Sequence, residues 1–533
     1  MPINREQIIA VFSNPDFYPH PVKKIEKKET HISLVFLTGD YVYKIKKPVD
    51  FGFLDFTTLE KRHLYCRQEI ELNRRLTTDV YLDLLTLRKK DSELFLGDTG
   101  EIVEYVIKMR QLSDANTLLS FLKNGLLKLE QTKGLARRLA GFYTAAERNS
   151  SIDKFGKIET VGFNTEENFT QTKPFVPSII PEDKYCFIRD ATRKFLERKE
   201  KLFDRRIDSG WIRDCHGDLR CEHVYFESHG IQIIDCIEFN DRFRYGDVAS
   251  DLAFLLMDLD FNGFRETARE LLTEYVRACY DPDIFTVLDF YKCYRAYVRL
   301  KVSCFQLESG TLETSEAHRM TEEAQRYLDL SYEAADHFQR PTIWLVCGLP
   351  ASGKSRMARE LSQRHIIPLF SSDVVRKELF GLKPDERVDE DFGQGIYSPE
   401  ASARTYAKLL ELAEASLRKG NSVVLDATFG NKDIRSKAKE IARKWNANFV
   451  IVHCRPPLST IERRLRAREG KKLVTDARLK HLEGHVKAFQ ELSGDELKKA
   501  IIIDTDRKFE QNVLKVFAES YFLSYRNKNI EAR

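Results

Sequence analysis

The sequence lacks the features of membrane, secreted and disulfide-stabilised proteins. No apolar run is long enough to cross a bilayer, and the N-terminal segment MPINREQIIAVFSNPDF carries charges where a signal peptide would be apolar. The ten cysteines are scattered without a Cys-x-x-Cys pair, and no histidine stands beside them at zinc-ligand spacing. These absences predict a cytoplasmic protein that has no membrane partner and whose thiols are reduced and mostly buried.

Length and composition predict two domains. The chain has 533 residues, of which 42% are hydrophobic and 32% charged, and this length allows about two to four domains. A polar helical stretch ends near Arg340, and a strand pattern begins after Pro341, so we predict domains at 1–335 and 341–533. Residues 341–533 hold 36 Lys and Arg against 26 Asp and Glu, a net charge of +10. This charge suits an anionic ligand such as nucleic acid or nucleotide phosphate.

The alternation of apolar and polar segments predicts a different fold for each domain. In the first domain, short strands and a hairpin signal at Thr38-Gly39-Asp40 precede a helix-rich middle, an α+β pattern. In the second domain strands and helices alternate, which is typical of a doubly wound parallel α/β sheet. The predicted strands span 32–37, 41–47, 231–235, 342–347, 422–426, 449–454 and 500–504, with a further pair of strands near 94–106, and the predicted helices include 59–76 and 458–468.

A complete phosphate-loop motif follows the first strand of the second domain. The motif G-x-x-x-x-G-K-S consists of Gly348, Leu349, Pro350, Ala351, Ser352, Gly353, Lys354 and Ser355. Backbone N–H groups of such a loop point at the phosphates of a nucleoside triphosphate, the lysine neutralises the β and γ oxygens, and the serine hydroxyl suits a Mg²⁺ ligand. The strand before the loop and the helix after it make a chance match improbable.

Further polar residues stand where strands of the second domain end. Asp373 follows one apolar strand, where it can deprotonate a hydroxyl acceptor, and Arg376 can pair with an acceptor phosphate or support the loop. Asp426 ends the next strand in the form of a Walker B carboxylate that holds Mg²⁺. Arg464 and Arg468 share one helical face and are candidates to cover the transferring phosphoryl group. Alternatively, these residues cap helices and turns or are solvent-exposed surface charges.

With these motifs, residues 341 to about 508 resemble the P-loop kinases of the zeta-toxin and polynucleotide-kinase group. The element Ser371-Ser372-Asp373-Val374-Val375-Arg376 carries the resemblance, which implies Asp373 as the general base and Arg376 as an acceptor contact. The stretch GIYSPEASARTY is similar to one found in predicted kinases of this group, and it makes Tyr397 and Arg404 candidate acceptor contacts. Small-molecule kinases share much of the pattern, so the acceptor stays open.

The first domain contains a second cluster of phosphoryl-transfer residues. Cys215-His216-Gly217-Asp218 and Ile233-Ile234-Asp235 place two carboxylates around a short hairpin. In phosphoryl transfer one such aspartate receives the hydroxyl proton and the other holds Mg²⁺. Asp218 is the expected base and Asp235 the expected metal ligand.

Residues 25 to 330 resemble the aminoglycoside phosphotransferase family, relatives of protein kinases. The resemblance implies that Lys44 contacts the nucleotide phosphates, with Lys46 as the competing choice, and that Glu69 pairs with this lysine. It also implies that Glu104 and Tyr105 lie at the hinge that binds adenine. Two acidic residues in YGDVASDLAF, Asp247 and Asp251, are expected to brace the active-site loop.

Two departures from this family pattern stand out. His223 occupies the position of a metal-binding asparagine, and imidazole is a poorer partner for Mg²⁺ than an amide oxygen. The turn near Glu29-Thr30-His31 has no glycine. This domain is therefore either an active kinase with altered nucleotide and metal binding or a pseudokinase.

Together the motifs predict a two-domain kinase with ATP and Mg²⁺ at a site in each domain. A protein-kinase-like fold is expected first and a P-loop fold second. The expected acceptor is a hydroxyl group on a small molecule or on the 5′ end of a nucleic acid. An ATP-dependent switch without a phosphoryl acceptor is the alternative from another functional class.

Overall fold

The computed structural model describes residues 4–91, 93–310, 312–386, 388, 390–391, 393–467 and 478–531, with side chains up to residue 525. The chain forms two compact units. One consists of Met1–Glu167, Arg206–Cys279 and Arg295–Leu300, and the other of Asn168–Arg205, Tyr280–Tyr294 and Lys301–Arg533. The change of pattern at Pro341 does mark the start of a parallel sheet, but helices that precede it in the chain pack with that sheet in the second unit.

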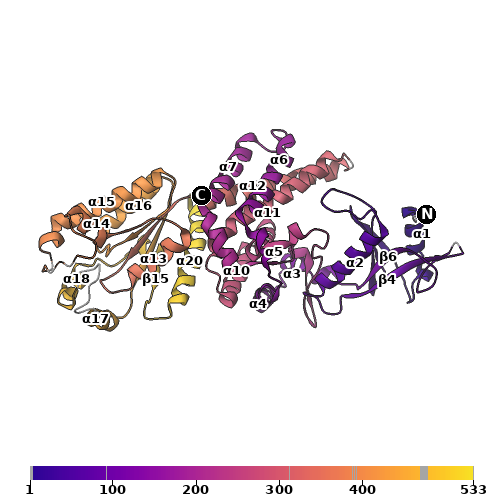
Figure 1. The fold of residues 1–533 in the computed structure, drawn as a ribbon, viewed down its shortest axis with the longest axis horizontal. Helices are drawn as coiled ribbons and strands as arrows, with labels where there is room; N and C mark the ends of the chain where they lie inside the picture. The colour runs from indigo at the N-terminus through magenta and orange to yellow at the C-terminus, as the bar shows by residue number, and fades with distance from the viewer. Residues whose placement is uncertain are drawn as a thin grey trace. The chain divides into compact units, whose positions relative to one another are not determined.

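A six-stranded antiparallel sheet begins the first unit. Its order is β1-β2-β3-β6-β4-β5, and helix α2 packs on strands β4 and β6 (Figure 1). Strands β2 and β3 alternate buried and partly exposed side chains around the expected hairpin. The bounds are β1 Glu26–Glu29, β2 Ser33–Leu37, β3 Tyr41–Lys46, α2 Leu59–Asn73, β4 Tyr81–Lys90, β5 Glu93–Leu96 and β6 Glu101–Arg110. Strand β4 was not predicted.

The rest of the first unit is mainly helical and holds two short two-stranded sheets. Helix α9 is apolar along most of its length and forms the centre of this region, because nearly all of its side chains are buried. The elements that position the site are α4 Leu129–Ala145, β7 Ile212–Asp214, β8 Val224–Glu227, β9 Gly230–Ile233, β10 Tyr245–Asp247, α9 Val248–Phe261 and α10 Arg265–Cys279.

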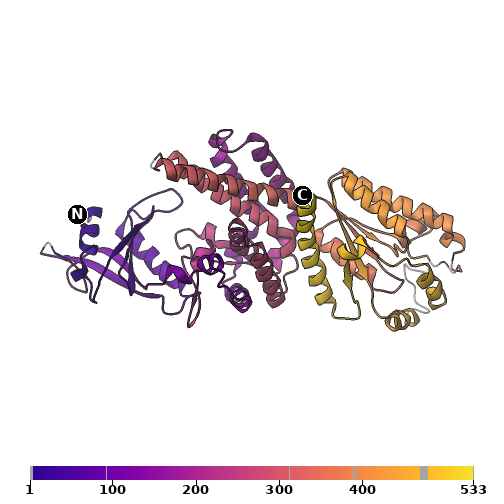
Figure 2. The same ribbon diagram turned by 180° about the vertical axis from the view of Figure 1, so that it is seen from behind.

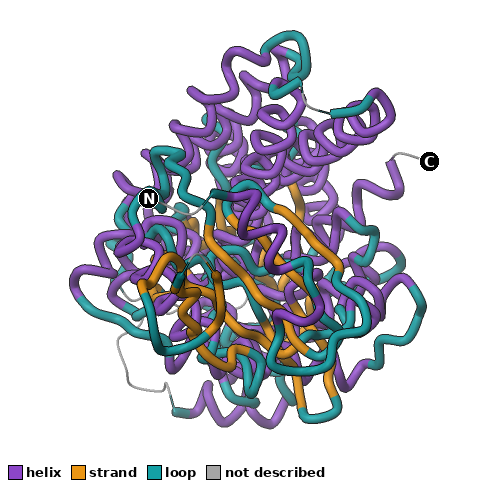
Figure 3. Tube along the Cα trace, turned by 90° about the vertical axis from the view of Figure 1, so that its right-hand side faces the viewer, coloured by secondary structure: helices purple, strands orange, loops and turns teal. Residues whose placement is uncertain are grey.

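The second unit contains a five-stranded parallel sheet in the order β12-β13-β11-β14-β15. Strand β11 lies in the middle with all but its first side chain buried, and helices flank the strands (Figure 1). Figure 3 distinguishes helices, strands and loops along the described chain. From β11 the chain runs to the edge strand β12, returns to β13 beside β11, and then crosses to β14 and β15 on the other side. The first strand therefore has later strands on both sides, which makes the sheet doubly wound. The bounds are β11 Thr342–Cys347, α13 Lys354–His365, β12 Leu369–Ser371, α14 Ser372–Leu379, α15 Pro399–Arg418, β13 Val423–Asp426, α16 Lys432–Lys444, β14 Asn448–Cys454, α17 Leu458–Arg466, α18 Leu482–Ala488 and β15 Ile501–Ile503.

Three long helices that precede Pro341 contribute to the second unit, together with the C-terminal helix α20, shown from behind in Figure 2. They are α7 Glu182–Asp208, α11 Ile284–Glu308 and α12 Thr314–Gln339, and α20 spans Phe509–Glu531. Arg205 of α7 donates to the Arg364 carbonyl at 2.6 Å, and Asp289 of α11 accepts from the Tyr521 hydroxyl at 2.6 Å. These polar contacts explain why the helices group with the parallel sheet.

Cysteine chemistry and membrane insertion can both be checked in the structure. All ten cysteines are free thiols, and eight of them are buried, which confirms the expected burial. Burial raises the pKa of Cys66 and of Cys347 to about 12, so these thiols stay protonated. Within the described part of the chain, no helix combines the length and the apolar character that a bilayer crossing requires.

Candidate active sites

The phosphate loop connects β11 to α13 with a backbone that demands glycine at two positions. Gly348 has φ +143°, and a Cβ there would lie 2.5 Å from the Cys454 carbonyl oxygen. Gly353 has φ +92°, and its Cβ would lie 3.0 Å from Thr505. Side chains are excluded at both positions, which leaves the backbone N–H groups free to approach phosphate at the start of α13.

Contacts from outside the motif hold the loop in place. The Thr505 hydroxyl donates to the Ser352 carbonyl at 2.5 Å, and Arg464 donates to the Ala351 carbonyl at 3.3 Å and to Thr505 Oγ1 at 2.9 Å. The prediction that Arg464 covers the phosphoryl group is therefore not supported, because its guanidinium is engaged with the loop itself. Arg468 lies outside the described residues.

Asp426 and Ser355, the two expected metal ligands, lie beside each other. Asp426 ends β13 and is 4% exposed, and Lys354 and Ser355 are neighbours that favour its charged form. Burial raises the pKa of Asp426, although the nearby charge of Lys354 opposes the rise. Its Oδ1 atom is buried and has no hydrogen-bond partner among the described residues. A buried carboxylate oxygen without a partner, beside a serine hydroxyl, fits a hard cation such as Mg²⁺ with its bound water.

A cavity of about 250 Å³ opens beside the loop. Asp373, in the first turn of α14, and Lys354 both line it, so the structure brings the expected base to the phosphate loop. Several lining residues were missed from the sequence, because they come from separate loops and helices and form no compact motif. They include Glu390, Ser402, Tyr406, Thr428, Asn431, His481 and His485.

Two of the three predicted acceptor contacts, Arg376 and Tyr397, line the cavity. Arg376 lines the cavity but is 6% exposed, donates to the Ile396 carbonyl at 2.7 Å and lies 4.9 Å from the Tyr397 ring centroid. It therefore supports the loop, the second of its two expected roles. Tyr397 also lines the cavity.

The structure does not place the third predicted contact, Arg404, at this cavity. Arg404 is exposed, lies over the Phe380 ring and does not line the cavity. On α15 the cavity-facing positions are Ser402 and Tyr406, four residues apart, and Arg404 lies between them on the other side of the helix.

His485 adds a neutral imidazole to the same cavity. Burial, together with the positive charge of Lys354, lowers the pKa of His485 to about 4. At neutral pH the cavity therefore contains this imidazole as an uncharged hydrogen-bonding group.

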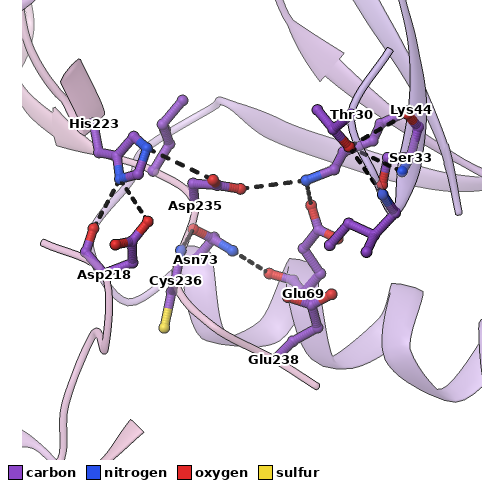
Figure 4. Close-up of polar contacts among 12 residues, drawn as sticks. Thr30, Ser33, Lys44, Glu69, Asn73, Asp218, His223, Asp235, Cys236 and Glu238 are labelled. Atoms are coloured by element: carbon purple, nitrogen blue, oxygen red, sulfur yellow. Dashed lines mark hydrogen bonds and ion pairs between the residues drawn. The ribbon is translucent and has the colours of Figure 1, made fainter. Parts of the chain in front are cut away.

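In the first unit, Lys44 of β3 stands between two carboxylates (Figure 4). Its Nζ lies 2.8 Å from Glu69 Oε1 on α2 and 3.3 Å from Asp235 Oδ1. The side chain is 16% exposed, so it can reach a phosphate from the site. Among the two candidate lysines, Lys44 is therefore the one that faces the expected metal ligand.

Lys46 points to the same face of β3 but is fully buried. It pairs with Glu69 at 2.6 Å and forms a short contact with Glu238. Burial opposes ionisation of Glu69, but the charges of Lys44 and Lys46 outweigh this effect and lower its pKa. Glu69 therefore forms ion pairs with both lysines. Lys46 has a structural role, because it is buried between Glu69 and Glu238.

The loop that carries Asp218 is fixed by Asp251. This carboxylate accepts from the backbone N–H groups of His216 at 3.1 Å and Gly217 at 2.8 Å and from the Tyr143 hydroxyl at 2.9 Å. The expected bracing role of Asp251 is confirmed. Asp247 forms a buried ion pair with Arg206, in which Arg206 Nε lies 2.5 Å from Asp247 Oδ2.

Arg220 also belongs to this site, although nothing in the sequence pattern indicated it and it lies only two residues after Asp218. Its Nε and Nη2 donate to the two oxygens of Asp218, each at 3.1 Å. Burial opposes ionisation of Asp218, but the charges of Arg220 and His223 outweigh it and lower the pKa of this carboxyl. Asp218 is thus held ionised, as a proton acceptor must be.

His223 lies between the two aspartates (Figure 4). Its Nδ1 is 2.8 Å from the Asp218 carbonyl, and its Nε2 is 3.7 Å from Asp235 Oδ2. Asp218, His223 and Asp235 each offer one ligand atom, and these atoms all lie within 4.8 Å of one another. The two carboxylates fit the Mg²⁺ that the family resemblance implies, whereas the imidazole does not.

The turn without glycine is closed by a side chain. Thr30 Oγ1 accepts from the backbone N–H groups of Ile32 at 3.3 Å and Ser33 at 3.0 Å. A threonine side chain can take the place of a backbone turn in this way.

Glu104 and Tyr105 are wrongly placed by the sequence analysis. Glu104 lies inside β6, is 2% exposed and pairs with Arg62 at 2.9 Å, and Tyr105 stacks on His63 with ring centroids 4.2 Å apart. Strand β6 continues to Arg110, so neither residue lies in the connection that follows the strand. The polar residues in the middle of β6 suggested that the strand ends there, at Glu104 and Tyr105, whereas it continues to Arg110.

Comparison with known proteins identifies relatives over most of the chain. The family model described as an AAA domain matches residues 343–492. The uncharacterized protein Mb2027c of Mycobacterium bovis and the uncharacterized protein Rv2004c of Mycobacterium tuberculosis are each 32% identical over 456 residues, covering 85% of this chain and 88% of the relative.

Solved structures are similar to parts of the chain. A choline/ethanolamine kinase family protein from Mesorhizobium loti is 14% identical with a TM-score of 0.37, covering 62% of this chain and 98% of that one. A gluconokinase from Sinorhizobium meliloti 1021 is 16% identical with a TM-score of 0.27, covering 36% and 98%. The parallel sheet of the second unit, over which the family model of an AAA domain matches, confirms the expected doubly wound P-loop fold, and the antiparallel sheet followed by helices in the first unit agrees with the expected α+β arrangement.

Proposed function

We propose that this chain, which belongs to the family of these mycobacterial proteins, is an ATP-dependent phosphotransferase whose C-terminal site transfers the γ-phosphate to a hydroxyl group. One observation carries the proposal: Asp373 and Lys354 line the same cavity. A nucleotide-binding lysine and a free carboxylate beside one space provide a donor position and an acceptor position together.

Each residue of this site has a chemical task in the proposed reaction. The loop backbone and Lys354 hold the β and γ phosphates, and Ser355 with Asp426 would hold Mg²⁺, which neutralises charge on the transferring group. Asp373 accepts the proton of the acceptor hydroxyl. Arg376 keeps Ile396 and the neighbouring Tyr397 in place, so the cavity is shaped before the acceptor binds.

The charges around the cavity favour a small uncharged acceptor over a polynucleotide end. Among the described lining residues, Lys354 serves the nucleotide and Arg376 is turned toward the Ile396 carbonyl. Asp373 and Glu390 add negative charge, whereas Asp391 is paired with Lys480 at 2.9 Å. The two carboxylates disfavour a phosphate on the acceptor. Hydroxyl, amide and imidazole groups from Ser402, Asn431 and His485 suit a compound with several hydroxyls.

The test is transfer of labelled γ-phosphate from ATP to sugars, polyols, nucleosides and oligonucleotides with a 5′-hydroxyl. Asp373→Asn is expected to lower transfer by about 10²- to 10⁴-fold with nucleotide affinity unchanged, because a general base contributes this much. The matched control is Asp433→Asn, an exposed aspartate in the first turn of α16, which is expected to keep full activity.

The outcomes separate the alternatives. Transfer to the oligonucleotide that Asp373→Asn abolishes would instead support a polynucleotide 5′-kinase. ATP hydrolysis that Asp373→Asn leaves unchanged, with no acceptor phosphorylated, would contradict phosphoryl transfer and favour an ATP-dependent switch.

A second nucleotide site in the first unit is supported by the convergence of Lys44, Asp218 and Asp235. In the full-length Lys354→Ala variant, we expect residual ATP binding that Lys44→Met removes. Lys133→Met, at a lysine of α4 that pairs with the exposed Glu130, is the control. If no ATP binding remains in Lys354→Ala, the first unit is not a nucleotide site.

A further inference from the structure

We propose that the cluster of Asp218, His223 and Asp235 selects a first-row transition cation, such as Mn²⁺, Co²⁺ or Zn²⁺, over Mg²⁺. The inference refines the second nucleotide site proposed above. It concerns metal choice alone, so it can be tested without nucleotide and without any phosphoryl transfer.

The ligand set itself departs from what Mg²⁺ prefers. Two carboxylates and one imidazole lie with their ligand atoms within 4.8 Å of one another. Mg²⁺ takes oxygen ligands in a strict octahedron, whereas Mn²⁺, Co²⁺ and Zn²⁺ accept imidazole nitrogen together with carboxylate oxygen. One nitrogen among three ligands therefore shifts the selectivity toward transition cations.

The surroundings of His223 fix the tautomer that a metal needs. A carbonyl oxygen can only accept a hydrogen bond, so the 2.8 Å contact between Nδ1 and the Asp218 carbonyl places a proton on Nδ1. In the neutral ring this leaves the lone pair on Nε2. Arg220 Nη2, which can only donate, lies 3.4 Å from Nε2 and agrees with this assignment. Backbone carbonyls orient metal-binding histidines in the same way.

The Nε2 lone pair accepts from Arg220 Nη2 at 3.4 Å and also faces a carboxylate. Nε2 lies 3.7 Å from Asp235 Oδ2 and Asp235 is half exposed, whereas His223 is 10% exposed. A lone pair and a carboxylate oxygen at this separation repel each other, and in the structure the Arg220 guanidinium beside Nε2 offsets this repulsion, so a bound metal ion would take the place of that donor. Figure 4 shows the imidazole between the two aspartates. The buried, oriented nitrogen thus completes a site that the more exposed Asp235 can adjust to fit the ion.

The competing explanation is that His223 only organises the loop as a hydrogen-bonding group. It predicts that no imidazole nitrogen is bound to the metal, whatever the change in affinity, whereas a ligand role predicts an imidazole nitrogen in the spectrum of the bound metal. The two explanations can therefore be separated by metal binding alone.

The experiment uses the full-length, metal-free protein without nucleotide. Co²⁺ binding is followed by visible absorption and Mn²⁺ binding by electron paramagnetic resonance, each with Mg²⁺ as competitor. We expect Mn²⁺ and Co²⁺ to bind at least tenfold more tightly than Mg²⁺. His223→Asn is expected to weaken Co²⁺ binding at least tenfold and to remove this preference, because even residues that only orient a ligand contribute 10- to 100-fold.

The control is His229→Asn, a partly exposed histidine of the same unit outside the cluster, which is expected to leave both affinities unchanged. Circular dichroism checks that the variants are folded. Should His223→Asn not fold, pulsed electron paramagnetic resonance of Mn²⁺ bound to the wild type replaces it, and coupling to an imidazole nitrogen is the expected result.

Equal affinities for Mg²⁺ and Mn²⁺ in the wild type, or the absence of nitrogen coupling, would overturn the proposal. A Co²⁺ affinity and spectrum that His223→Asn does not change would overturn it as well. Loss of the proposed phosphoryl transfer would not, because metal binding is measured separately.

Discussion

The two candidate sites are built in opposite ways. In the second unit, eight consecutive residues form the phosphate loop, and its backbone N–H groups make the binding surface. In the first unit, the site is made of side chains far apart in the sequence, and Lys44 meets Asp235 across 191 positions. A site made from local backbone depends on a few glycines, whereas a site made from distant side chains depends on the ion pairs that hold its elements together.

The largest expected effect comes from breaking the buried ion pairs of the first site. Lys46→Met leaves Glu238 without its buried cation and Glu69 with only Lys44, so we expect it to destabilise the first unit by about 3–5 kcal/mol. Hydrogen exchange of peptides from β3 and α2 measures the change. Lys47→Met, at the next lysine along the chain, should cost less than about 1 kcal/mol. Equal effects of the two variants would contradict the structural role of Lys46.

The next prediction concerns ATP affinity when a side chain is added to the backbone of the phosphate loop. Gly348→Ala places a Cβ 2.5 Å from the Cys454 carbonyl at φ +143°, and strain of about 1–3 kcal/mol corresponds to a loss of ATP affinity of roughly 5- to 150-fold. Gly494→Ala, at φ +54° with open space around the added Cβ, is the control and should bind ATP normally. Titration calorimetry measures both, and a normal affinity for Gly348→Ala would show that the loop tolerates the side chain.

A third effect depends on pH and concerns the stability of the second unit. Burial and the charge of Lys199 lower the pKa of His365 to about 3, and the pKa of His485 is lowered to about 4. Because the unfolded chain takes up these protons near pH 6.5 and the folded chain does not, stability falls as the pH drops from about 6.5 to 4. Each histidine contributes about 1.4 kcal/mol per pH unit in this window.

Denaturation of the full chain between pH 7 and 4.5 tests this prediction. His365→Gln should make the pH dependence shallower, and His318→Gln, at a histidine that is 77% exposed, should not. A slope that His365→Gln leaves unchanged would mean that His365 is protonated in the folded chain.

The smallest effect separates two positions of α15. Tyr406→Phe removes the hydroxyl that accepts from Phe429 N–H at 3.2 Å, and losing such a hydrogen bond costs about 0.5–1.5 kcal/mol. We expect a 2- to 10-fold higher KM for the acceptor, and no change for Arg404→Ala, which lies outside the cavity. A larger effect of Arg404→Ala would restore it as an acceptor contact.

The contrast between the sites also decides what could be predicted from sequence. The phosphate loop, the Asp373 position and the Walker B strand were recognised because each depends on residues close together in the chain. Lys44, Glu69 and Asp218 were found through their order along the chain.

The failures have physical causes. Glu104 was misplaced because a buried pair with Arg62 makes a core position look like an exposed one. Arg404 was misplaced because a motif does not show which side of a helix faces a cavity. Arg220 and the residues lining the acceptor cavity depend on packing between elements, which no local pattern reports.

The contacts of Thr505 and Arg464 with the phosphate loop have a consequence for the kinetics of nucleotide capture. A loop that is already held from outside loses its conformational entropy when the protein folds and not when the ligand arrives. Association of nucleotide should then need no slow rearrangement of the loop. Substitution of Thr505 should mainly lower the association rate of ATP, which can still bind once the loop has become ordered.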